Sequence, residues 1–212
     1  MKCGVCGLEY GLAHNCSGVV AEVSTEEGAA PPAGFDPLYY FQLAFKIVCW
    51  DDVSIRRASR DSVALFYGIF IWLVTSTILF VFIAVPAILS RNIGPPAAMA
   101  IGIIFGLIVF LVITGVWTTI QIGLCHLISK WLFAGTGTYL GIMRPLLLAY
   151  FVNLLTLIPL AGPLAAGITS TAVLMMVFEE VEGIARLTAF GISATINILF
   201  FVAQNLFSHR PM

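Results

Sequence analysis

Residues 62–89 read SVALFYGIFIWLVTSTILFVFIAVPAIL, a stretch without a single charged side chain. At 1.5 Å per residue this stretch makes a helix about 42 Å long, whereas the hydrocarbon core of a bilayer is about 30 Å thick. It therefore predicts a transmembrane helix. The chain as a whole has 212 residues, of which 60% are hydrophobic and 10% are charged, while soluble domains usually carry about 25% charged residues. The composition predicts that further helices cross the membrane.

Four more apolar stretches follow, and we expect spans at 97–128, 143–160, 163–180 and 187–207. The second contains Ala98, Gly102 and Gly106, and small residues at every fourth position permit close contact between helices in lipid. Pro159 and Pro163 favour a tight turn between the third and fourth stretches. The apolar halves on either side of that turn are about 24 Å long, so a re-entrant loop is the alternative to a hairpin of two full spans. The expected fold class is an all-α membrane protein with five transmembrane helices.

The basic residues predict how the chain is oriented. With the N-terminus inside, eight of the ten Lys and Arg residues fall on the inner side, and only Arg91 and Arg210 fall on the outer side. Inner loops usually carry the excess of positive charge. The first long apolar run begins only at residue 62, so no secretory signal peptide is expected before it. We predict a multi-pass protein of the cell (inner) membrane with its N-terminus in the cytoplasm and its C-terminus outside. The count is the same for four spans, so it does not decide between hairpin and re-entrant loop.

A cluster of cysteines marks residues 1–16. Cys3 and Cys6 form a C-x-x-C turn followed by glycine, and His14 and Cys16 come soon after. In a reducing cytoplasm such a cluster is more typical of a metal site than of disulfides, and Zn²⁺ takes four such ligands in a tetrahedron. We predict a structural zinc ion bound by these four side chains, since four protein ligands leave no open position for catalysis. The alternatives are a cluster of free or palmitoylated thiols and an intermolecular site or disulfide.

Two segments connect this tail to the first span. Residues 17–36 are polar and contain proline and glycine, which predicts a flexible linker. Residues 37–60 are predicted to form an interfacial, amphipathic segment. Their apolar run PLYYFQLAFKIVCW is too short to cross a bilayer, and its aromatic rings suit the headgroup boundary. Asp51 and Asp52 are expected to end this run and to cap a following helix.

Short motifs after residue 125 occur in an order that is similar to that of a known family. They are Gly135 and Gly137 in a loop, Arg144, Ala149-Tyr150, Ile158-Pro159-Leu160 with Gly162, and Glu182-Gly183. This order resembles the Yip (Ypt-interacting protein) domain of membrane proteins in its prokaryotic-type form, over about residues 37–207. The resemblance implies a five-helix membrane domain with a cytoplasmic N-terminus. Eukaryotic members bind Rab-type GTPases in membrane traffic. The Asp-Leu-Tyr-Gly-Pro motif that those members carry at the first span is missing here, which weakens the case for a small-GTPase partner.

A second group of candidate residues lies near the predicted ends of spans. Glu179, Glu180 and Glu182 could form an ion or proton site, because carboxylates at membrane depth mark such pathways. We interpret them instead as an interfacial loop, with Glu182 paired to Arg186 four residues later. His126 is a candidate contact for a lipid headgroup, or a satisfied histidine at a helix end.

Polar side chains inside the predicted spans have two interpretations. They could line a cavity for a small solute, or they could hold neighbouring helices together, at about 0.6 kcal/mol each. We favour packing. The residues concerned are Asn153, Thr156, Thr169, Ser170, Thr171, Asn197 and Gln204.

Several function classes find no support in the sequence. A net charge of −1 argues against nucleic-acid binding, which needs a basic surface. We expect no enzyme, because neither G-x-S-x-G nor H-E-x-x-H occurs and the three histidines lie in different regions. The expected function is an integral membrane scaffold or adaptor in membrane organisation or a trafficking-like process, whose tail binds a protein partner. The alternative is a small-solute transporter or channel that uses the polar residues of spans three to five.

Overall fold

The structure is a computed structural model that describes residues 36–90 and 95–208, with only the backbone for residue 201 and residues 203–208. In these ranges every regular element is a helix, which confirms the predicted all-α class. The predicted zinc-binding tail at 1–16 lies outside the described residues, as does the linker at 17–36 up to its last residue.

Two short helices precede the long apolar ones, and aspartates determine where they begin. α2 (Pro37–Val48) begins after Asp36, whose carboxylate accepts a backbone N–H of the first turn at 3.0 Å. α3 (Asp52–Arg60) begins after Asp51, whose carboxylate accepts another at 3.2 Å. Both carboxylates satisfy donors that have no partner within their own helix. The predicted interfacial segment is thus two helices, and the predicted capping by Asp51 is confirmed.

The first apolar stretch forms one helical rod with an irregular turn in it. α4 (Ser62–Leu79) continues through a π-helical turn, η1 (Phe80–Ala84), into α5 (Val85–Leu89). Pro86 lies two residues after this turn, and proline cannot donate the hydrogen bond that a regular helix requires. α6 (Pro96–Phe133) has 38 residues and is therefore about 57 Å long.

The third and fourth segments form a hairpin. α7 (Tyr139–Leu148) continues as a 3₁₀ helix, η2 (Ala149–Leu157), and after a turn α8 (Gly162–Val177) ends in a π-helical turn, η3 (Phe178–Glu182). A 3₁₀ helix rises about 2.0 Å per residue, so α7 and η2 together measure about 33 Å. The expected length of about 24 Å was too short, because the helix begins at Tyr139 and part of it is 3₁₀.

Four helical segments of the described residues are long and apolar enough to cross a membrane. They are Ser62–Leu89, Pro96–Phe133, Tyr139–Leu157 and Gly162–Glu182, which correspond to the first four predicted spans. α9 (Arg186–Ser208) corresponds to the fifth. Its fully described part, Arg186–Phe200, is a shorter apolar helix.

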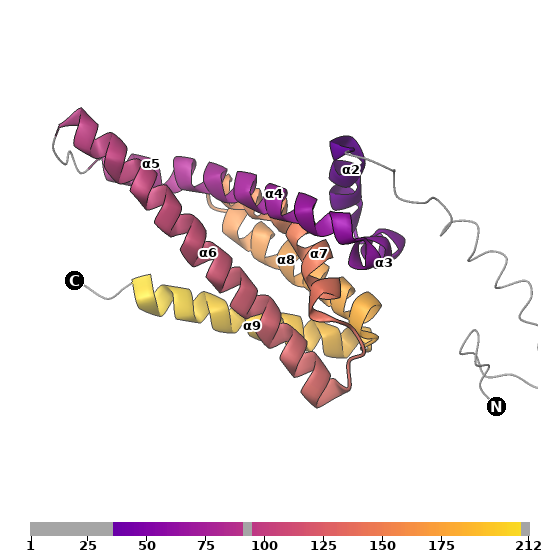
Figure 1. The fold of residues 1–212 in the computed structure, drawn as a ribbon. Coiled ribbons are helices and arrows are strands. Elements are labelled where there is room, and N and C mark those ends of the chain that lie inside the picture. The colour runs from indigo at the N-terminus through magenta and orange to yellow at the C-terminus, as the bar shows by residue number, and fades with distance from the viewer. Residues whose placement is uncertain (1–35, 91–94, 209–212) are drawn as a thin grey trace, which may run out of the picture. The chain divides into compact units, whose positions relative to one another are not determined.

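The buried core lies where α2 and α3 meet the long helices. α4 packs along α7 and η2, and α8 packs against both η2 and α9. In Figure 1, α2 and α3 lie beside the N-terminal end of α4, and the α6–α7 connection lies beside the α8–α9 connection. These two connections contain the candidate site.

α6 is the most exposed of the four long apolar segments, since none of its most apolar window is buried. Its predicted stripe of small residues is used only in part. Gly106 faces the ring of Phe80 and Gly115 faces that of Trp72, whereas a side chain at Gly102 would meet nothing within 4 Å. Gly106 therefore permits the expected close contact and Gly102 does not.

Candidate functional site

The four predicted zinc ligands, Cys3, Cys6, His14 and Cys16, lie outside the described residues, so the zinc site stays a prediction. Within residues 36–90 and 95–208, no group of three or more His, Cys, Asp or Glu side chains is placed to hold a metal ion. Cys49 is exposed, Cys125 is buried, and both are free thiols.

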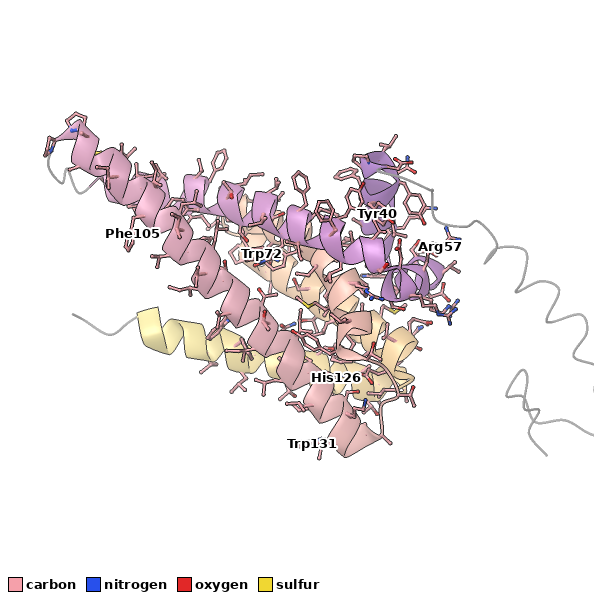
Figure 2. The ribbon with its side chains drawn as sticks, viewed as in Figure 1. Tyr40, Arg57, Trp72, Phe105, His126 and Trp131 are labelled. Atoms are coloured by element: carbon pink, nitrogen blue, oxygen red, sulfur yellow. The ribbon has the colours of Figure 1, made fainter. Side chains whose placement is uncertain are left out.

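A cluster of polar groups lies where the α6–α7 connection meets the α8–α9 connection. We call it the Glu182 junction, and it consists of Glu182, His126, Ser129, Gly135 and Gly137. His126 points from α6 toward these two connections (Figure 2). The junction thus joins the end of α6 and the loop that follows it to Glu182, which lies 56 positions after His126.

Glu182 is the centre of the junction, and its side chain is 0% exposed. One carboxylate oxygen, Oε1, lies 2.6 Å from Nδ1 of His126. The other, Oε2, accepts the backbone N–H of Gly137 at 2.9 Å. The backbone carbonyl of Glu182 accepts the N–H of Thr136 at 3.0 Å. Oε2 and the main-chain carbonyl of this residue therefore hold the α6–α7 connection in place, and Oε1 contacts α6 itself.

The backbone at both connections adopts left-handed conformations that place these groups. α6 ends at Ala134, which has a φ of 54°, and η3 ends at Gly183, which has a φ of 70°. Thr138 is the capping residue before α7, and its hydroxyl accepts the N–H of Gly141 at 3.1 Å. The loop between Ala134 and Thr138 is short enough to lie directly over Glu182.

The two glycines of this loop are required by close approach. A Cβ atom at Gly135 would overlap Oγ of Ser129 and Oε2 of Glu182, and one at Gly137 would lie 2.8 Å from the carbonyl oxygen of Val181. Real Cβ atoms do not approach other atoms so closely, because protein interiors are already closely packed. The Gly-x-Gly spacing in the sequence is thus explained by contact with Glu182 and not by phosphate binding.

The contact between His126 and Glu182 determines what the junction can do chemically. A separation of 2.6 Å between a ring nitrogen and a carboxylate oxygen requires a proton between them, because two acceptors at that distance would repel each other. The pair is therefore joined by a buried hydrogen bond, and hydrogen bonds to an ionised carboxylate are about twice as strong as neutral ones. Such a bond suits a structural clamp or a proton-holding site.

The other charged groups of the region are arranged differently from the prediction. Arg186 contacts Glu179 through Nε at 2.7 Å, so its predicted pairing with Glu182 is wrong. The i,i+4 rule fails here because Gly183 ends one helix before Arg186 begins the next. Glu180 pairs with Arg56 of α3 at 2.6 Å.

The three glutamates therefore do not share one environment. Glu179 and Glu180, which pair with Arg186 and Arg56, are partly exposed, whereas Glu182 is fully buried. The interpretation of all three as a water-accessible loop is wrong for Glu182. His126 is bound within the protein and is therefore the satisfied histidine of the two sequence interpretations.

Polar side chains inside the long helices bond to one another. Gln121 of α6 donates to Asn197 of α9 at 2.9 Å, and Asn197 donates to Thr171 of α8 at 2.8 Å. Asn153 and Thr156 bond to backbone carbonyls of η2, at 2.9 and 2.6 Å. The sequence analysis did not select Gln121, although an amide within an uncharged run was a usable signal. The bonds of Gln121 and Asn197 connect α6, α9 and α8.

No protein-family model, curated protein or solved structure matches this chain. The functional argument therefore depends on the geometry described above.

Proposed function

We propose that this chain is an integral membrane scaffold or adaptor, a helical membrane domain that carries a partner-binding tail in the cytoplasm. One observation carries the proposal: polar side chains within the apolar helices find hydrogen-bond partners inside the protein, either on their own helix or, for Gln121, Asn197 and Thr171, between helices. Asn153, Thr156, Thr171 and Asn197 all bond within the protein. These residues motivated the transporter alternative, and their internal bonding favours the packing interpretation instead.

The proposed membrane domain has five spans, with the N-terminus inside and the C-terminus outside. The lengths of the α7–η2 and α8–η3 segments support a hairpin of two full spans over a re-entrant loop. The 23 residues of α9 are about 34 Å long, which supports a fifth crossing. The distribution of Lys and Arg supports the cytoplasmic N-terminus.

We also propose that the domain is of the Yip type. Support comes from the way separate motif positions meet in space. Gly135 and Gly137 come from the loop before α7, Glu182 and Gly183 from the loop before α9, and the two loops bond to each other. A small-GTPase partner is not part of the proposal, since the motif that accompanies it is missing from the sequence.

Proximity labelling tests the adaptor role. A labelling enzyme is fused to the full chain and to a variant that lacks residues 1–16, and the labelled neighbours are identified in native membranes. A third chain with Cys6→Ser separates the effect of zinc from that of the tail itself. The proposal predicts that specific neighbours disappear when the tail is removed. An unchanged set of neighbours would contradict an adaptor role.

A further inference from the structure

α2 is apolar on two opposite faces, and only one of them is covered. The inner face buries Tyr40, Leu43, Ala44 and Ile47 against the long helices. The outer face leaves large side chains exposed: Leu38 is 66% exposed, Phe41 60% and Phe45 56%. A helix that served only to cover the core would carry polar residues on this outer face.

Trp50 follows α2 with an exposed side chain, at a position that normally takes glycine. The N–H of Trp50 bonds to the carbonyl of Ile47 at 3.0 Å, and that of Asp51 bonds to the carbonyl of Lys46 at 3.0 Å. This pair of bonds is the Schellman motif, whose left-handed residue is usually glycine. Trp50 adopts that conformation with a φ of 66°. Its side chain is 54% exposed, so contacts within the described structure do not compensate fully for the strain.

The neighbours of α2 indicate which environment covers this face. Tyr40 stacks on Tyr67 of α4 with the ring centroids 4.1 Å apart, and Phe41 lies near Phe151 of η2 at 6.3 Å. α2 therefore packs against α4 and η2. Phe66, next to Tyr67, is 62% exposed, so α4 also carries exposed apolar side chains close to its contact with α2.

The composition of the surface matches one part of a bilayer. Lys46 is exposed in the last turn of α2, and the helix contains no acidic residue. Tryptophan is enriched at the headgroup level of membranes, and lysine extends its ammonium group from apolar surroundings toward the phosphates. A buried protein interface, in contrast, is usually depleted of lysine.

We propose that Leu38, Phe41, Phe45 and Trp50 are embedded in the headgroup–acyl boundary of the leaflet on the N-terminal side, and that Trp50 keeps its strained conformation for this contact. The proposal rests on the membrane-crossing domain proposed above. It assigns the outer face of α2 to lipid and its inner face to the helical core. An amphipathic helix in this position lies about 5–10 Å into the boundary region.

Nitroxide accessibility tests the assignment in the full chain. A nitroxide is attached through p-acetylphenylalanine at position 45, which leaves the native cysteines unchanged, and the protein is reconstituted in phosphatidylcholine vesicles. A label at Phe70, which is 58% exposed on α4, is the control for membrane crossing. We expect oxygen to reach the label at 45 more readily than a water-soluble nickel complex does, at a shallower depth than at 70.

Each other outcome contradicts a specific step. Better access for the nickel complex at 45 would place this face in water, and exclusion of both reagents would mean that a protein segment covers it. Either result overturns the lipid assignment while the label at 70 remains in lipid. If the label at 70 is also accessible to nickel, the membrane-crossing domain itself fails.

Two substitutions of Trp50 separate its lipid contact from a structural role. Trp50→Gly removes both the ring and the strain, and Trp50→Ala removes the ring alone. In detergent we expect the glycine variant to unfold at a temperature about 2–4 °C higher than the unmodified chain. In vesicles both variants should move the label at 45 toward water. A lower unfolding temperature for Trp50→Gly, or an unchanged label depth in both variants, would contradict the proposal.

Discussion

Glu182 and His126 show how much one buried charged residue can organise. The Glu182 carboxylate accepts a hydrogen bond from the backbone N–H of Gly137 in the α6–α7 loop. Nδ1 of His126 on α6 lies 2.6 Å from its other oxygen. Removing one member of a buried pair leaves the other charge without compensation, at a cost of about 3–5 kcal/mol. The junction should therefore be more sensitive to substitution than the exposed ion pairs around it.

A double-mutant cycle measures the strength of this pair. We expect His126→Ala to lower the free energy of unfolding by about 3–5 kcal/mol, because the carboxylate stays buried and unpaired. Glu182→Gln keeps an acceptor for the Gly137 N–H and should cost about 1–3 kcal/mol. The double variant should lose about 1–3 kcal/mol less than the sum of the two. Unfolding in mixed detergent micelles provides these values.

Arg186→Ala is the control for the cycle. It removes an exposed ion pair with Glu179 in the same region, and exposed pairs contribute little to stability. Its effect should be smaller than either substitution in the junction. If the losses at His126 and Glu182 simply add, the two side chains do not interact as described.

Gly137 tests the close approach of the two loops. Gly137→Ala would place a Cβ atom 2.8 Å from the carbonyl oxygen of Val181, and we expect a loss of about 1–3 kcal/mol in the free energy of unfolding. The control is Gly167→Ala within α8, where nothing lies within 4 Å, and it should gain up to about 1 kcal/mol. Equal effects for the two substitutions would mean that the loop does not lie against Glu182.

At the scale of the elements, uncharged length identifies four long apolar segments, and local chemistry identifies the aspartate that caps α3. The sequence does not reveal the 3₁₀ stretch of η2 or the π-helical turns, because these depend on packing and not on hydropathy. Nor does it pair Glu182 with His126, since the two residues are separated by 56 positions. The i,i+4 rule selected Arg186 instead, because that rule assumes one continuous helix.

A hydrogen bond from Tyr40 contributes to the attachment of α2 to α4, and the neighbouring Tyr39 lacks such a bond. The hydroxyl of Tyr40, which lies between α2 and the start of α4 (Figure 2), donates to Asp61 at 2.6 Å. Tyr40→Phe should lower the free energy of unfolding by about 2 kcal/mol. The hydroxyl of Tyr39 is buried without a hydrogen-bond partner among the described residues, so Tyr39→Phe is the control and should cost nothing. Equal losses in thermal unfolding would contradict this attachment.

Tyr40 also predicts a change of stability at high pH. Burial, together with the hydrogen bond to Asp61, raises the pKa of Tyr40 above its ordinary value of 10.0. The unfolded chain therefore loses this proton first as the pH rises. The stabilisation is complete below about pH 10 and declines above it. In Tyr40→Phe, this part of the alkaline loss in unfolding temperature should be missing, and an identical pH profile would contradict the assignment.

The tail is tested by its metal content. If Cys3, Cys6, His14 and Cys16 bind zinc, the purified chain should contain one zinc ion per molecule, and Cys6→Ser should lose most of it because three ligands hold zinc less tightly than four. Elemental analysis of both proteins measures this. Cys49→Ser, directly after α2, is the control and should keep the metal. Zinc well below one ion per molecule in the unmodified chain would contradict the site.

At the scale of the whole molecule, the central claim is that an odd number of helices crosses the bilayer. Four segments have the required length and composition, and α9 adds a fifth candidate. If the hairpin of α7 and α8 were re-entrant, neither of its arms would cross, and the three remaining crossings would still place the C-terminus outside. Four crossings, in which only one arm of the hairpin spans the bilayer, would place both termini on the same side. The side on which the C-terminus lies therefore decides between an odd and an even number of crossings.

Paired topology reporters at the two termini measure this directly. One reporter is active only in the cytoplasm and the other only outside it, and each is fused in turn before Met1 and after Met212. The account predicts cytoplasmic activity at the N-terminus and external activity at the C-terminus. Activity of the same reporter at both ends would contradict five spans, and an external N-terminus would contradict the orientation.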